Sequence, residues 1–172
     1  MAFEKSTKKL QTMTALEEMR KSMQKLGPIP NDMRIYDYAV HFFNIIVMFQ
    51  DQYSVSALAG KQPTEEIKRL GMHISNAGRC SDGWVRAKKG QPVTLDNLYL
   101  GNVAGLWTAP AAKFRAESDD KYMQNNIQAQ LRGFISSHRE PIMDLINKVL
   151  KNTKSPNENI FFRLFGKKGN VK

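Results

Sequence analysis

The sequence contains a single cysteine, Cys80, among 172 residues. One thiol cannot close an intramolecular disulfide or supply the set of thiolates that holds zinc in a zinc finger, so both kinds of small stabilised domain are excluded. This scarcity is typical of proteins from a reducing compartment. We therefore expect a cytoplasmic or other reducing intracellular location, with a virion as an alternative.

Long apolar runs are also missing. The longest, Ile45 to Phe49, falls far short of the roughly 20 residues that a membrane helix needs. The first residues are interrupted by Glu4 and Lys5, unlike the apolar stretch of a signal peptide. We expect neither a membrane span nor an export signal.

Motifs that mark catalytic and cofactor sites are scarce. Neither GxxxxGK[ST] nor GxGxxG occurs, so nucleotide hydrolysis is not indicated. The histidines His41, His73 and His138 form no pair of metal ligands at helical spacing. Cys80 beside Arg79 could act as a nucleophile with His73 or His138 as base, but the spacing supplies neither an orienting group nor an oxyanion site. We expect no enzyme, and no catalytic residue, metal or cofactor.

Strict alternation of apolar and polar residues is absent, and no segment repeats at a fixed period, which argues against β-sandwiches and solenoids. Apolar residues recur instead at spacings of three and four. The sequence predicts an all-α fold, a single-domain bundle of about six helices with a basic Gly-rich loop and extended termini. We delimit an amphipathic helix or arm at 1–28, a helical core at 29–151, and a linker with a basic-aromatic tail at 152–172.

Capping residues, glycines and prolines set the expected helix ends. Gly27 and Pro28 stop the first helix, Asn31 or Asp32 caps the second, and Ser118 caps the fifth. The predicted helices cover 6–26, 33–53, 63 to about 76–78, 94 to a stop at Pro110, 118 through 134, and 140–151. The second is apolar nearly all round, so we expect it at the centre of the bundle.

Basic residues exceed acidic ones by 26 to 16, a formal net charge of +10. The excess is concentrated in the segments 1–26, 61–90 and 151–172. Such a balance in one small domain points to an anionic partner, with nucleic acid as the leading candidate.

The segment from Gly78 to Pro92 places a tryptophan among cations, within glycines that favour a loop and allow a short hairpin around Trp84 and Val85. An aromatic ring beside Lys and Arg offers stacking for a base and charges for phosphates. The equally weighted alternative is a solvated turn with Trp84 packed on the core. The candidate nucleic-acid-binding residues are Arg79, Trp84, Arg86, Lys88 and Lys89.

Two terminal stretches are candidates for contact with a subunit or partner. They comprise Phe161, Phe162, Arg163 and Phe165 in the tail and Met13, Met19 and Met23 in the first helix. For the methionines we favour packing within the chain over docking of a partner. For the tail we favour a subunit contact, because free phenylalanines are a liability. Packing on its own bundle, nucleic-acid binding and insertion at an anionic membrane surface are the alternatives.

The leading hypothesis is a non-catalytic protein that binds RNA or single-stranded DNA mainly through phosphates, with weak sequence specificity. It would form homo-oligomers through its terminal segments, as a nucleocapsid or coat-like subunit. The alternative is a helical adaptor or scaffold that docks an acidic protein partner.

Overall fold

The computed structural model of the chain describes residues 2–53, 55–58, 64–84, 91–99, 110–116 and 119–152, with the backbone alone for 2–7 and 79–84. This part of the chain is all-α, as the sequence predicts. It contains the α-helices α1 (Ala2–Leu26), α2 (Ile35–Gln52), α3 (Glu65–Trp84), α4 (Ala111–Ala116) and α5 (Lys121–Asn152), and the 3-10 helix η1 (Val55–Leu58).

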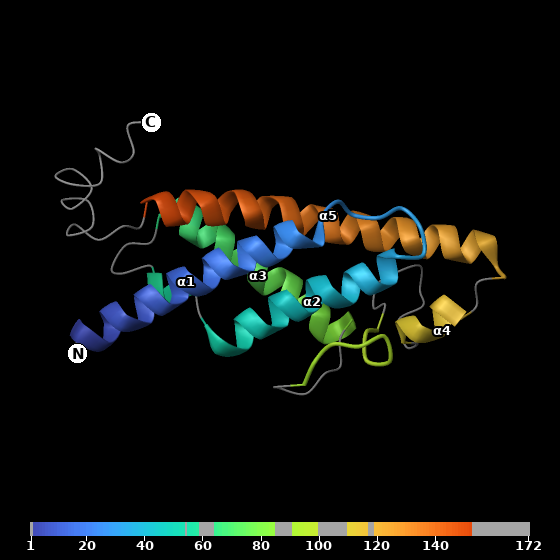
Figure 1. Ribbon diagram of the computed structural model, residues 1–172, viewed down its shortest axis with the longest axis horizontal. Helices are drawn as coiled ribbons and strands as arrows, with labels where there is room; N and C mark the ends of the chain where they lie inside the picture. The colour runs from blue at the N-terminus through green and yellow to red at the C-terminus, as the bar shows by residue number, and fades with distance from the viewer. Residues whose placement is uncertain are drawn as a thin grey trace.

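The four long helices surround one apolar core (Figure 1). Helix α1 packs against α2 and α5, and α3 packs against the same two helices. Phe42 and Phe43 of α2 meet edge to face with ring centroids 5.5 Å apart, and Phe43 stacks on Phe134 of α5 at 5.8 Å. The predicted central place of α2 is therefore confirmed for this face of the helix.

Helix α1 ends where the sequence predicts. Gly27 has a φ of 75°, a left-handed conformation that residues with a Cβ avoid, and its N–H donates to the carbonyl of Gln24 at 3.0 Å. Leu16, Met19 and Met23 are buried. The segment that we delimited as an arm thus packs into the common core.

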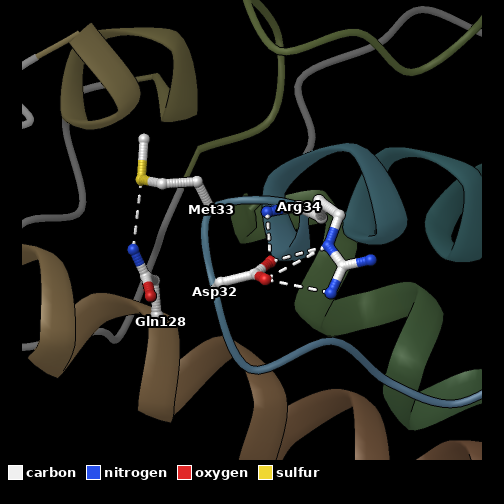
Figure 2. A network of polar contacts seen from close by, with 4 residues as sticks. All are labelled: Asp32, Met33, Arg34 and Gln128. Atoms are coloured by element: carbon white, nitrogen blue, oxygen red, sulfur yellow. Dashed lines mark hydrogen bonds and ion pairs between the residues drawn. The ribbon is translucent and has the colours of Figure 1, made fainter.

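The turn before α2 is held by Asp32, one of the two predicted capping residues. Its carboxylate accepts the backbone N–H of Arg34 at 3.0 Å and the Arg34 Nε at 2.9 Å (Figure 2). These hydrogen bonds from Arg34 lower the pKa of Asp32 below its ordinary value. On the next residue, the sulfur of Met33 accepts a hydrogen bond from Nε2 of Gln128 on α5 at 3.1 Å (Figure 2). This connection therefore fastens the start of α2 to α5.

Helix α3 is longer than predicted. It begins after Thr64, whose hydroxyl accepts the N–H of Ile67 at 3.3 Å, and it continues past the expected end near 76–78 to Trp84. Gly78 does not break the helix: it lies directly under the side chain of Gln50 from α2, where a Cβ would collide. The glycine permits close approach of two helices rather than a turn.

The predicted helix from Thr94 is wrong for the described residues. Residues 95–97 form a turn in which the Asn97 carboxamide accepts the N–H of Thr94 at 2.8 Å. Tyr99 pairs as an isolated bridge with Pro110, so this proline precedes α4 instead of ending a helix. Val103, Leu106 and Trp107, the other inner-face residues of that prediction, lie outside the described residues.

The last two predicted helices are one. Helix α5 begins after Asp120, whose carboxylate accepts the N–H of Met123 at 3.0 Å, whereas the predicted cap, Ser118, lies outside the described residues. It then runs through Pro141, which we expected to start a new helix. Ile135 and Ile142, on either side of the proline, are both fully buried. Burial on both sides offsets the backbone hydrogen bond that proline removes.

Candidate functional site

A groove of about 660 Å³ runs between α1 and α2 on the outside of the bundle. The two helices are antiparallel (Figure 1), so the groove follows both of them lengthwise. We call it the α1–α2 groove. It is lined by Ala15, Glu18, Met19, Ser22, Lys25, Leu26, His41, Asn44, Ile45, Met48, Phe49, Gln52 and Tyr53.

The groove has an apolar floor with charges towards its two ends. Met48 of α2 has 59% of its surface exposed, although it lies within the most apolar helix of the chain. Glu18 is exposed at the end near Tyr53, and Lys25 is exposed at the other end. Such a surface can receive an amphipathic segment, with its apolar side on Met48 and a cation near Glu18.

Sequence reasoning missed this groove because it treated α2 as buried all round. Ile35, Ala39, Phe42 and Ile46 form the buried stripe. Met48 falls outside that stripe, and this surplus of apolar residues over one helical face was the available signal.

Asn44 has a role that the sequence analysis also missed, since it counted only as an interruption of an apolar run. Its side chain donates to the carbonyl of Val93 at 3.0 Å and accepts the N–H of Val93 at 2.7 Å. Two hydrogen bonds to one residue fix the segment 91–99 against α2. Asn44 therefore positions the chain that follows the predicted basic loop.

The predicted nucleic-acid-binding residues are divided by the end of α3. Arg79 and Trp84 belong to the last two turns of the helix, so the hairpin expected around Trp84 is wrong at that residue. Arg86, Lys88 and Lys89 lie outside the described residues. The structure accordingly gives no geometry in which the five candidates come together.

The two terminal candidates have different outcomes. Met19 and Met23 of the methionine stripe are buried and Met13 is partly buried against the core, which is the packing within the chain that we favoured. Contact with a partner through Met19 or Met23 would require α1 to separate from the bundle. The tail candidates Phe161, Phe162, Arg163 and Phe165 lie outside the described residues.

The structure brings together two histidines that are far apart in the sequence. The rings of His73 on α3 and His138 on α5 have centroids 5.7 Å apart, and Phe134 contacts His138 at 4.8 Å. Nδ1 of His138 is buried and has no hydrogen-bond partner among the described residues. Burial lowers the pKa of His138, with a further contribution from His73; burial and the positive charge of Arg69 lower the pKa of His73.

This pair predicts a loss of stability in mild acid. Because the folded pKa of each histidine lies below its unfolded value, the neutral forms are favoured in the folded state, and this stability is present above the unfolded pKa near 6.5 and lost as the pH falls below it. The free energy of unfolding, measured with urea at pH 7.5 and pH 5.0, should fall less in His138→Gln than in the wild type. His41→Gln, at an exposed position on α2, is the control and should keep the wild-type difference.

The net positive charge is distributed unevenly between the helical body and the rest of the chain. The described residues contain 17 Lys and Arg and 14 Asp and Glu, a balance of +3. The remaining +7 of the formal +10 therefore belongs to the other segments. Residues 85–90, the basic segment, carry three cations and no acid, and residues 153–172, the C-terminal segment, carry five cations and one acid.

No helix within the described residues is long and apolar enough to cross a membrane. In the same part of the chain, no three His, Cys, Asp or Glu side chains lie close enough to hold a metal ion. In the comparisons with known proteins, no family model, no curated protein and no solved structure matches this chain.

Proposed function

We propose that the protein is a non-catalytic nucleic-acid-binding protein that holds RNA or single-stranded DNA mainly by its phosphates and assembles as a nucleocapsid or coat-like subunit. The observation that carries this proposal is the separation of charge. A helical body near charge balance is followed by two short segments that hold most of the excess cations. Cations concentrated in this way neutralise a phosphate backbone with little dependence on base sequence.

The basic segment follows directly on the last turn of α3, where Arg79 and Trp84 already stand. A tryptophan beside consecutive cations suits a single strand, because a base can stack on the ring while phosphates contact Arg86, Lys88 and Lys89. The C-terminal segment adds further cations at a chain end. Two basic sites on one subunit would let neighbouring subunits share a strand.

The test is the affinity of a labelled single-stranded oligonucleotide for the nuclease-treated protein, measured by fluorescence anisotropy at several salt concentrations. In Arg86→Ala/Lys88→Ala/Lys89→Ala, the Kd should rise about tenfold or more near physiological salt. The slope of log K against log salt should become shallower by about 2, since each phosphate contact contributes about 0.7 on a single strand. Helical circular dichroism should not change.

The matched control removes the same charge from the helical body. Lys8→Ala/Lys21→Ala/Lys68→Ala takes three exposed lysines from α1 and α3 and leaves the basic segment intact. It should retain the wild-type slope and most of the affinity. If both triple variants weaken binding equally, net charge alone governs the interaction and the basic segment is not the site.

The second candidate function is an adaptor that docks an acidic protein partner, and the α1–α2 groove favours it. An apolar floor with Lys25 and His41 at one end is suited to an acidic amphipathic helix. The same titration separates the two functions. An adaptor would show no binding of polynucleotide at low salt, whereas the nucleic-acid-binding protein would show tight binding that falls steeply with salt.

A further inference from the structure

We infer that the α1–α2 groove is the docking site for the aromatic stretch 160–168 of a second copy of this chain. The contact supplies the assembly step of the proposed function and in that respect rests on it. It is tested without nucleic acid, so its failure can be told apart from a failure of nucleic-acid binding.

The groove exposes apolar surface that the described part of the chain does not cover. Met48 is 59% exposed, and its neighbours Leu26 and Ile45 are only partly buried. Phe49 and Met19 form a closed floor beneath them. A groove of about 660 Å³ with such a floor has room for several large side chains of an incoming segment.

The stretch 160–168 has the chemistry that this groove needs. Phe161, Leu164 and Phe165 are spaced at i, i+3 and i+4, the pattern by which an amphipathic helix inserts into an apolar groove. Arg163 and Lys167, one helical turn apart, would then lie on the other side. One of them can approach Glu18, the carboxylate that lines the groove.

Another apolar stretch outside the described residues, 100–109, is a poorer occupant. Its two ends are held together, because Tyr99 pairs with Pro110 and the carbonyl of Leu98 accepts the N–H of Ala111 at 2.6 Å. A stretch closed at both ends cannot extend to another molecule. The C-terminal segment is joined to the body at one end only, at Asn152 of α5.

The place where α5 ends favours a neighbouring copy over the chain's own groove. Helix α1 packs against both α5 and α2 and lies between them in Figure 1. A stretch that folded back would have to pass around α1, with eight residues, 153–160, before the first phenylalanine. A neighbour's stretch can enter the groove from solvent. Groove and stretch are different surfaces, so the contact is head to tail and can propagate along a strand.

The test is complementation between two full-length variants, followed by sedimentation velocity on nuclease-treated protein. Met48→Glu disables the groove and leaves the stretch intact; Phe161→Ser/Phe162→Ser/Phe165→Ser does the reverse. The wild type should self-associate, and each variant alone should associate at least about tenfold more weakly, as expected for losing the burial of one large apolar side chain. The equimolar mixture should form a one-to-one complex, because it contains one intact groove and one intact stretch.

The control is Met72→Glu on α3, since Met72 is 54% exposed, similar to Met48, and does not line the groove. It should associate like the wild type. A wild type that stays monomeric at all concentrations overturns the contact between copies. So does a wild type that associates while both disabling variants associate equally well, because the interface then lies elsewhere. A mixture that forms no complex, although the wild type associates and both variants retain wild-type helicity, overturns it too.

Discussion

Arg139→Ala is expected to lower the free energy of unfolding by about 3 kcal/mol. Arg139 of α5 is only 8% exposed, and its Nη2 donates to the carbonyl of Met23 at 3.3 Å and to that of Gly27 at 3.2 Å. These carbonyls lie at the C-terminal end of α1, where the helix dipole attracts a cation and backbone acceptors lack helical partners. Hydrogen bonds from a charged donor contribute roughly 1.5 to 3 kcal/mol, and truncation also leaves a cavity. Urea unfolding followed by circular dichroism measures the change.

The control for Arg139 is another arginine with an acidic partner. Arg34 pairs with Asp32 at 2.9 Å, but its side chain is 76% exposed, so Arg34→Ala should cost less than about 1 kcal/mol. Tyr38→Phe tests the shared acceptor, because the Tyr38 hydroxyl also donates to the carbonyl of Gly27, at 2.9 Å. The double variant should deviate from additivity. If Arg139→Ala costs no more than Arg34→Ala, Arg139 does not hold the end of α1.

The sequence predicts the fold best where a single residue determines a helix end. Gly27 ends α1 because only its left-handed conformation is required, and that requirement is local. The same rule fails at Gly78, because the decisive contact comes from Gln50 on another helix. At Thr94 the capping pattern is present, yet Asn44 holds the adjacent Val93 from α2 and the chain turns instead. Contacts between elements, which spacing does not encode, decide these two cases.

The candidate sites were harder to predict than the helices. His73 and His138 lie 65 residues apart in the sequence, and only the packing of α3 against α5 brings their rings together. The α1–α2 groove likewise depends on which side of α2 is covered, and periodicity alone assigned all of its apolar residues to the core. Met48 shows the difference, since its residue type indicates burial and its position on the helix leaves it exposed.

Pro141→Ala is expected to stabilise the protein by about 1 to 2 kcal/mol. Within a helix, proline removes one backbone hydrogen bond and costs about 3 kcal/mol relative to alanine. Alanine at position 141 restores an N–H four residues after Ser137, so that the Ser137 carbonyl regains its helical donor. Part of the gain is offset, because the partly buried ring is lost and the unfolded chain becomes more flexible. The midpoint of urea unfolding should rise without a change in its slope.

Pro92→Ala is the matched control, because Pro92 lies outside the helices and is exposed. There the substitution restores no helical hydrogen bond and only frees the unfolded chain, so it should destabilise by about 0.4 to 1 kcal/mol. The two replacements thus have opposite expected signs. A loss of stability in Pro141→Ala would mean that the core requires the shape that the proline gives to α5. In that case packing around Ile135 and Ile142 accepts the proline because it fits, rather than in spite of its cost.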